Sequence, residues 1–223
     1  HHHHRHRWCA CQRYHLSVKA DGTNISGATG ATYTLTNAEV GKAITVVANY
    51  TDSRSTAETV TSLATSAVTN TNDAGSIAIS GTATQGQTLT TNITDPDGVP
   101  ASGITYQWKA DGTNISGATS STYTLTNAEV GKAITVVASY TDSRTTAETV
   151  TSPDTGTVTN TNDAGSIAIT GTATQGQTLS TTITDPDGVP ASGITYQWKA
   201  DGTNISGATN STYTLTNAEV GKA

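Results

Sequence analysis

Apolar and polar side chains alternate with a period of two through several short stretches of the chain. Within residues 104–110, Ile104, Tyr106 and Trp108 fall on one face of an extended strand, and polar side chains stand between them. Such alternation is typical of a half-buried β-strand. No ten-residue stretch has the spacing of an amphipathic helix. The pattern therefore predicts an all-β protein.

Turn signals divide residues 73–162 into six expected strands. Asp111-Gly112 predicts a two-residue hairpin turn, because both residues tolerate the positive φ that such a turn requires. Pro153 is expected to break the last strand, since proline lacks the N–H that a sheet needs. The expected strands are 76–80, 87–94, 104–110, 122–126, 133–141 and 148–158.

The same segments return every 90 residues. Asp73–Ile79 recurs as Asp163–Ile169, and residues 73–133 differ from residues 163–223 at only four of 61 positions. A unit of this length suits an autonomous β-sandwich domain and is too long for a single ankyrin or tetratricopeptide repeat. The chain is therefore expected to be a tandem array.

Several motifs of the repeat are similar to one known group of proteins. They are Gly81–Leu89, Tyr106–Trp108, Gly117–Thr119, Tyr123–Gly131 and Tyr140–Asp142, with the linker Thr159–Ala164. Together they resemble the immunoglobulin-like repeats of large bacterial adhesins, which are related to type I secreted and repeats-in-toxin proteins and have cadherin-like joints. The resemblance covers residues 19–223. It implies tandem immunoglobulin-like β-sandwiches, with Trp108 as the core tryptophan, in an extracellular spacer.

The period and the resemblance together predict four segments. Residues 1–18 do not match the repeat, and only residues 73–162 contain every expected strand, so this copy alone is expected to be independently stable. The expected segments are an out-of-frame segment at 1–18, the C-terminal part of repeat 1 at 19–72, a complete repeat 2 at 73–162 and a truncated repeat 3 at 163–223.

The first 18 residues have two interpretations. A DNA string that encodes residues 91–108, with threonine at positions 92 and 96, encodes HHHHRHRWCACQRYHLSV when it is read one base earlier. A frameshift in repeat DNA therefore explains this segment and removes both cysteines from the native repeat. The alternative is a metal site, although Cys9 and Cys11 are closer than zinc-binding cysteines usually are. Its ligands would be His1, His2, His3, His4, His6, Cys9 and Cys11.

Composition excludes several classes of function. Residues 19–223 carry 8 basic and 17 acidic side chains, and this negative charge disfavours a nucleic-acid partner. No apolar run is long enough to span a membrane, so membrane insertion is not expected. These residues also contain neither His nor Cys, which leaves Ser-His-Asp and Cys-His catalysis without a base. We therefore expect no enzymatic activity.

The acidic residues of the repeat are candidates for calcium ligands. Asp95-Pro96-Asp97-Gly98 lies between two expected strands, at the end of the repeat where the preceding linker enters. Calcium would be a structural cofactor here, and it requires six to eight oxygen ligands. The alternative is an ordinary turn, in which the aspartates bind local backbone. The first joint would use Asn70, Asn72, Asp73, Asp95, Asp97, Asp142 and Glu39. The second would use Asn160, Asn162, Asp163, Asp185, Asp187 and Glu129.

The expected function is that of a structural spacer or stalk in a bacterial cell-surface or secreted adhesin. Calcium bound at the joints would stiffen it. Its expected partners are neighbouring repeats of the same chain, and a host protein or carbohydrate would be bound by modules outside this fragment. Near-identity of the copies favours a role in setting length over distinct specificities. The alternatives are a ligand-binding module for carbohydrate or protein and an accessory domain of a secreted enzyme. An aromatic content of 5% disfavours sugar-stacking loops.

Overall fold

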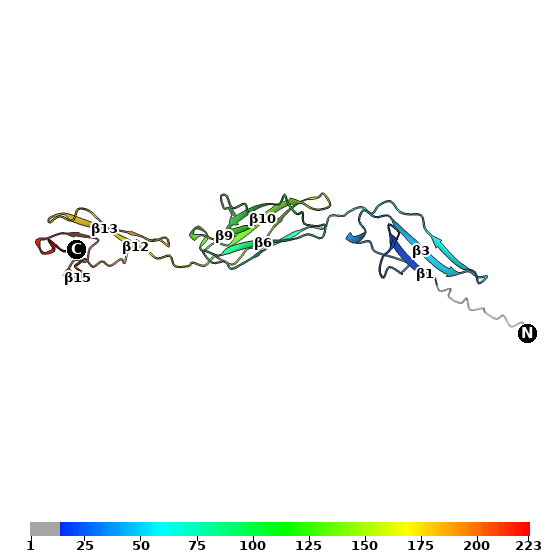
Figure 1. Ribbon diagram of the computed structural model, residues 1–223, viewed down its shortest axis with the longest axis horizontal. Coiled ribbons are helices and arrows are strands. Elements are labelled where there is room, and N and C mark those ends of the chain that lie inside the picture. The colour runs from blue at the N-terminus through cyan, green and yellow to red at the C-terminus, as the bar shows by residue number, and fades with distance from the viewer. Residues whose placement is uncertain (1–13) are drawn as a thin grey trace, which may run out of the picture. The chain divides into compact units, whose positions relative to one another are not determined.

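The computed structural model describes residues 14–223, and these residues form an all-β protein (Figure 1). Their only helical segments are three single 3-10 turns, at Asn37–Glu39, Asn127–Glu129 and Asn217–Glu219. No helix among these residues is long and apolar enough to cross a membrane. The predicted fold class is therefore confirmed at the level of secondary structure. The immunoglobulin-like packing of the sheets stays a prediction.

The chain forms two compact units, and their boundaries differ from those of the repeats. Among the described residues, one unit comprises residues 14–77, 93–105 and 138–150, and the other comprises residues 78–92, 106–137 and 151–223. The predicted complete copy at 73–162 contributes to both units. The predicted repeat boundaries stay a prediction.

The first unit contains an antiparallel sheet in the order β2-β1-β3-β4. Strand β1 pairs with β3 from His15 opposite Asn49 to Ala20 opposite Ile44. Residues 15–18 therefore occupy the strand that residues 105–108 form one repeat later, and Val18 is buried where the repeat has Trp108. The strands are β1 His15–Ala20, β2 Thr23–Asn24, β3 Ile44–Thr51 and β4 Ala57–Thr61. Residues 1–13, with the alternative His and Cys metal site, lie outside the described residues.

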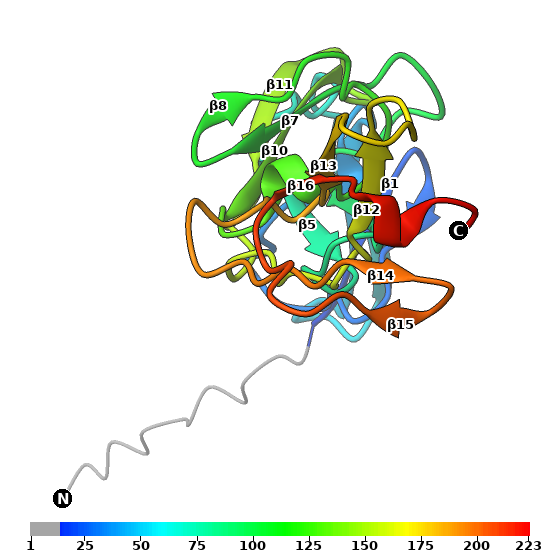
Figure 2. The same cartoon turned by 90° about the vertical axis from the view of Figure 1, so that its left-hand side faces the viewer.

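The predicted complete copy contains two antiparallel sheets. Their orders are β11-β10-β7-β8 and β5-β6-β9, and the strands of the first can be followed in Figure 2. The strands are β5 Ser76–Ser80, β6 Thr88–Thr94, β7 Thr105–Ala110, β8 Thr113–Asn114, β9 Thr122–Thr124, β10 Ile134–Thr141 and β11 Ala147–Thr151.

A core of large side chains lies within the second unit. Trp108 is fully buried, its indole N–H donates to the Ser120 carbonyl at 2.8 Å, and its ring centroid lies 6.0 Å from that of Tyr123. The hydrogen bond removes the cost of burying the indole N–H unpaired. The largest fully buried side chains of the described residues are Trp108, Leu89, Leu125, Ile134 and Val136.

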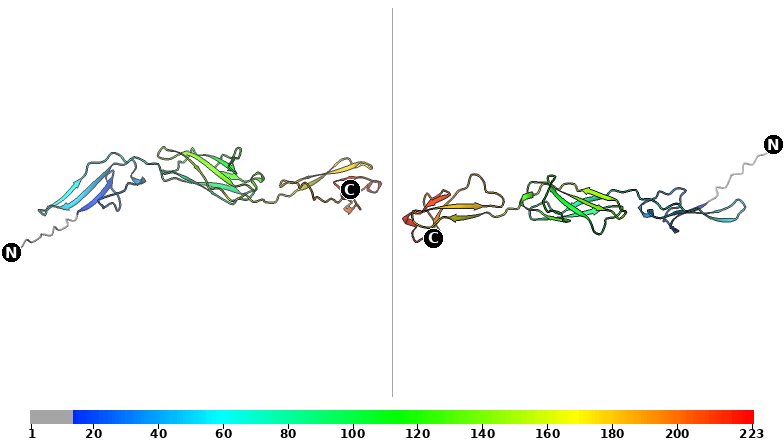
Figure 3. Two further views of the ribbon diagram at one scale, coloured as in Figure 1. Left: turned by 180° about the vertical axis from the view of Figure 1, so that it is seen from behind. Right: turned by 90° about the horizontal axis from the view of Figure 1, so that it is seen from above.

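The last copy has its own strands within the second unit. Strands β12 and β13 pair from Ser166 opposite Thr184 to Thr170 opposite Ser180, and β16 joins them (views from behind and above in Figure 3). Trp198, Leu179 and Ala208 form a small buried cluster. The strands are β12 Ser166–Thr170, β13 Thr178–Thr184, β14 Lys199–Ala200, β15 Thr203–Asn204 and β16 Thr212–Thr214.

Two expected strands end well before their predicted C-terminal ends, and three others begin one residue later than predicted. The strand expected at 148–158 ends at Thr151, and pairing returns only as an isolated bridge between Thr157 and Ala133. The first copy has the same interruption with Leu63 in the place of Pro153, because β4 also ends at Thr61 and pairing returns at the bridge between Ala43 and Ala67. Proline is therefore compatible with the interruption but is not its cause. The strand expected at 122–126 ends at Thr124 because Thr126 is already the N-cap of a 3-10 turn. The Asp111-Gly112 hairpin is confirmed by the pairing of Ala110 with Thr113.

Candidate metal centre

The Asp95–Gly98 loop is a hydrogen-bonded turn. The Asp97 N–H donates to Asp95 Oδ1 at 2.8 Å, and the Gly98 N–H donates to the Asp95 carbonyl at 3.0 Å. Gly98 has a φ of 100°, a conformation that favours glycine. The ordinary turn that the sequence offered as the alternative to a calcium site is therefore present. It uses only one oxygen of the Asp95 carboxylate, so it does not exclude ligand binding.

Asp97 is buried at the joint and binds the linker that precedes its own repeat. Its Oδ2 accepts the Asp73 N–H at 2.9 Å and the Asn70 side-chain amide at 3.1 Å. The Asp73 N–H is the main reason that the pKa of Asp97 lies below its usual value. Asp97 Oδ1 and Asn70 Oδ1 are both buried without a hydrogen-bond partner among the described residues. Two acceptor oxygens are thus left unsatisfied at this joint.

The 3-10 turn of the first copy contacts the same loop. The Asn37 side-chain amide donates to Asp73 Oδ2 at 2.9 Å and to the Pro96 carbonyl at 3.3 Å. Arg144 in turn donates from its guanidinium to the Asn37 carbonyl at 2.7 Å. All of these residues belong to the first compact unit. Asn37 therefore binds both the linker and the loop through its side chain, and its carbonyl accepts a hydrogen bond from the Arg144 guanidinium.

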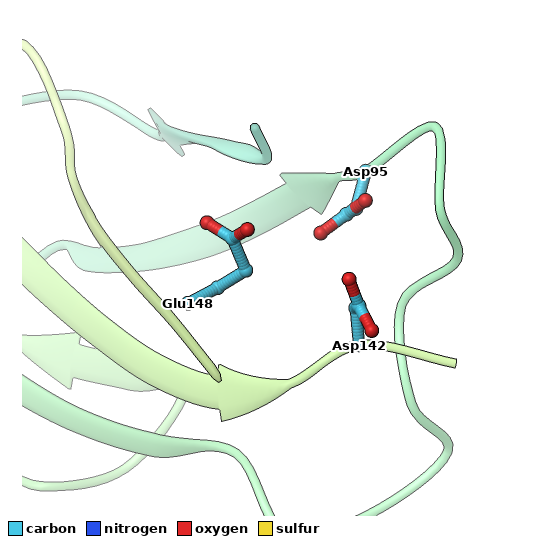
Figure 4. A group of neighbouring side chains, drawn as sticks. All are labelled: Asp95, Asp142 and Glu148. Atoms are coloured by element: carbon cyan, nitrogen blue, oxygen red, sulfur yellow. The ribbon is translucent and has the colours of Figure 1, made fainter. Parts of the chain in front are cut away.

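Three carboxylates converge beside this joint (Figure 4). Asp95 follows β6, Asp142 follows β10 and Glu148 lies in β11, and one oxygen from each lies within 4.8 Å of the others. Asp142 and Glu148 are buried, and Asp95 is half-buried. Two ionised carboxylates at this distance repel each other by about 3.5 kcal/mol at an effective dielectric constant of about 20. The arrangement therefore favours a compensating positive charge.

The contacts of the three carboxylates leave one buried oxygen unused. Asp142 Oδ1 accepts the N–H groups of Arg144 and Thr146, each at 2.8 Å, whereas Asp142 Oδ2 is buried without a partner among the described residues. Glu148 Oε1 accepts the Asn72 side-chain amide at 2.7 Å. Carboxylate oxygens are the ligands that hard divalent cations prefer. The cluster can therefore supply part of a calcium coordination shell.

The Tyr140 hydroxyl fixes the position of the first of these carboxylates. It donates to Asp95 Oδ2 at 2.8 Å. Burial raises the pKa of Tyr140, and the hydrogen bond to the negatively charged Asp95 raises it further. The phenol consequently remains a neutral donor over the physiological pH range.

The second joint repeats part of this arrangement 90 residues later. The Asp163 N–H donates to Asp187 Oδ2 at 2.8 Å, and the Asn127 side-chain amide donates to the Pro186 carbonyl. Asp163 also accepts the Gln85 amide at 2.5 Å, and the Asp187 N–H donates to Asp185 at 2.9 Å. Asn160 and Asn162 are exposed.

The structure distributes the predicted ligands among three settings. It brings Asp95 and Asp142 together, and it places Asn70, Asp73 and Asp97 in the joint. Glu39 and Glu129 instead complete capping boxes, in which Glu39 Oε2 accepts the Thr36 N–H at 2.9 Å and Glu129 Oε2 accepts that of Thr126 at 2.9 Å. Metal binding by these two glutamates stays a prediction.

Glu148 was not among the predicted ligands, although the sequence contains a signal for it. In β11 the side chains of Glu148 and Val150 are buried while those between them are exposed. A charged residue on the inward face of an alternating strand requires a partner. In the first copy the corresponding residues Tyr50 and Glu58 stand directly opposite each other in the sheet. Treating the two strands as a hairpin would have placed Glu148 beside Tyr140.

No protein-family model matches the chain, and no curated protein is significantly similar to it. Solved structures with similarity include a Ca²⁺-stabilised adhesin that helps an Antarctic bacterium reach out and bind ice. Its sequence identity is 14% and the TM-score is 0.32, and the match covers 94% of this chain and 56% of that chain. The chain thus spans little more than half of that structure. At this score the likeness supports no conclusion about function.

Proposed function

We propose that this chain is a row of immunoglobulin-like β-sandwich spacer repeats from a bacterial cell-surface or secreted adhesin, with no catalytic role. The motifs of the repeat and its antiparallel strands support this architecture. Neighbouring repeats are its direct partners, and binding to a host protein or carbohydrate belongs to modules outside these residues. Its acidic surface is unsuited to nucleic acid, and the described residues offer no helix for membrane insertion.

The observation that carries the proposal is the recurrence of the same contacts at two joints. Asn37 donates to the Pro96 carbonyl and Asn127 donates to the Pro186 carbonyl. The Asp73 and Asp163 N–H groups likewise donate to the carboxylates of Asp97 and Asp187. A joint that binds each repeat to its predecessor in one geometry transmits orientation along a stalk.

Calcium at the joints is part of the proposal. At the first joint, the residues that would hold the ion are Asn70 and Asp97, whose unsatisfied buried oxygens fit a hard cation, together with Asp73. Calcium would supply the positive charge that these oxygens lack. Arg144 already contributes positive charge near Asp97, so joint binding is expected to be weak.

Pulsed electron–electron double resonance between two nitroxide spin labels tests the joint. The spin labels are attached at two exposed positions, by Thr23→Cys and Ala147→Cys, after Cys9 and Cys11 are replaced by serine. We expect a narrow distance distribution that narrows further in calcium. Asn37→Ala is expected to broaden it, because it removes both side-chain bonds across the joint.

Asn217→Ala is the matched control, because Asn217 occupies the same 3-10 turn of the last copy and donates no side-chain hydrogen bond within the described residues. It should leave the distribution unchanged. A broad distribution in the unsubstituted joint, insensitive to Asn37→Ala, would contradict the stalk.

A further inference from the structure

We propose that Asp95, Asp142 and Glu148 form a Ca²⁺ site that belongs to the repeat itself and is separate from the joint ligands. The three residues come from one copy and from three different segments of it: the end of β6, the turn after β10 and strand β11. The site does not depend on the spacer function, since it requires no residue of a neighbouring repeat to supply a carboxylate.

An unpartnered buried oxygen points to a ligand at this cluster. Asp142 is 5% exposed, and its Oδ2 has no hydrogen-bond partner among the described residues. Figure 4 shows its carboxylate facing that of Asp95, with the Glu148 carboxylate directed toward the same space. The other Asp142 oxygen is held by two backbone N–H groups, so the side chain cannot turn Oδ2 toward solvent without losing both bonds.

Ligand chemistry selects the ion. The cluster offers only carboxylate oxygens and contains no His or Cys, which excludes a site of the zinc or copper type. Three anionic side chains from separate segments suit the larger and more adaptable coordination shell of Ca²⁺ better than the strict octahedron of Mg²⁺. We therefore assign calcium.

The tyrosine and the linker support the position of the carboxylates. The Tyr140 hydroxyl holds Asp95, and the Asn72 amide holds Glu148. Gly75 passes so close that a Cβ atom there would overlap the Tyr140 hydroxyl and lie 2.8 Å from Asp95 Oδ2. The backbone at Gly75 therefore packs directly against Tyr140 and Asp95 and leaves no space for a side chain beside the cluster.

The first copy supplies a matched comparison within the same chain. It has Asp52 and Glu58 in the places of Asp142 and Glu148, but Arg5 stands where the repeat has Asp95. Asp52 forms the same turn, accepting the Arg54 and Thr56 N–H groups at 2.8 Å. Turn formation therefore does not require the third carboxylate, and the complete triad is what distinguishes the proposed site.

The test uses the intact 223-residue chain and CaCl₂. Calorimetric titration is expected to give a dissociation constant in the range of about 10⁻⁴–10⁻³ M that is typical of extracellular modules. Glu148→Gln and Asp142→Asn are each expected to weaken this binding at least tenfold. Glu58→Gln and Asp52→Asn are the matched controls and should leave it unchanged.

Hydrogen exchange localises the ion and separates a binding role from a structural one. Calcium should slow amide exchange in residues 138–150 of the unsubstituted protein and leave residues 48–60 unaffected. In EDTA, Glu148→Gln should exchange no faster than the unsubstituted protein, because it removes one of three mutually repelling charges. In calcium, the amides of residues 138–150 should exchange faster in this variant than in the unsubstituted protein.

Three results would overturn the assignment. They are an absence of calcium-dependent protection at residues 138–150, equal acceleration of exchange by Glu148→Gln in EDTA and in calcium, and equal protection by Mg²⁺ at the same concentration. Asp97→Asn distinguishes this site from the joint. It should alter the distance distribution across the joint while the protection at residues 138–150 persists.

Discussion

At the scale of single residues, Gly75 is a position where the structure has no space for a side chain. Gly75→Ala is expected to displace the Tyr140 hydroxyl from Asp95, because an added Cβ would overlap that hydroxyl. Loss of a hydrogen bond to a charged group, together with the overlap, should cost about 2–4 kcal/mol. Urea unfolding of the intact protein, followed by Trp fluorescence, measures this.

Gly156→Ala is the control for this substitution. A Cβ at Gly156 has nothing within 4 Å, and its φ is not in the positive range. It should be neutral or stabilise by about 0.5 kcal/mol through the unfolded chain. Equal effects of the two substitutions would show that the contact between Gly75 and Tyr140 is not made.

Asp97 makes the joint sensitive to acid. Its pKa is lowered in the folded protein, chiefly by the Asp73 N–H. Between the folded and unfolded pKa values, the unfolded chain binds more protons than the folded one, so stability rises with pH there. The contribution of Asp97 is therefore complete above the unfolded value of about 3.9 and is lost as the pH falls below it.

Acid titration of Asp97→Asn measures that contribution. The unsubstituted protein should lose protection of the Asp73 amide below about pH 4, because protonation weakens the acceptor of that N–H. The variant should show weaker protection that hardly changes over the same interval. Parallel pH profiles for the two proteins would count against a role for the ionised carboxylate.

At the scale of elements, the period-two pattern located the strands of residues 73–162, where alternate side chains are buried, as in β10 and β11. The expected strand at 76–80 is observed with the same bounds. Propensity and alternation did not predict the end of the strand at 122–126, where the capping box of Thr126 and Glu129 outcompetes the sheet for the backbone. The break near Pro153 was predicted, but the first copy is interrupted at the same place with Leu63 there, so the break depends on how the two strands pair and not on the proline.

The candidate site was only partly predictable for the same reason. Asp95 and Asp142 were identified because turn sequences mark the ends of strands, and ends of neighbouring strands meet. Glu148 lies inside a strand, and its inward position follows from the pairing of β10 with β11 and not from a motif. The burial that leaves Asp142 Oδ2 without a partner is a property of packing. It has no counterpart in the sequence of any single segment.

At the scale of the whole molecule, near-identical sequences have different environments in different copies. Ile77 is 4% exposed, whereas the corresponding Ile167 is 61% exposed. Leu125 is 1% exposed, whereas Leu35 is 46% exposed. The same side chain therefore contributes much less hydrophobic stabilisation in one copy than in another.

These differences predict where cooperative stability resides. All five of the largest fully buried side chains lie within residues 73–162. A fragment of these residues is expected to unfold in one transition, with calorimetric and van't Hoff enthalpies in agreement and a stability of about 5–13 kcal/mol. Residues 19–72 and 163–223 should show no such transition by differential scanning calorimetry. A broad, non-cooperative melt of the 73–162 fragment would contradict this expectation.

The same fragment separates the two proposed calcium positions. It keeps all three carboxylates of the cluster, Asp95, Asp142 and Glu148, whereas the joint is lost with Asn37 and Asn70. It also lacks Asn72, so Glu148 must bind the ion without that supporting amide. Calcium at ten times the dissociation constant should stabilise it by about 1.4 kcal/mol, since the ion binds the folded state alone. Glu148→Gln should abolish that gain. Stabilisation seen only in the intact chain would instead place calcium at the joint and leave the carboxylate cluster without a metal.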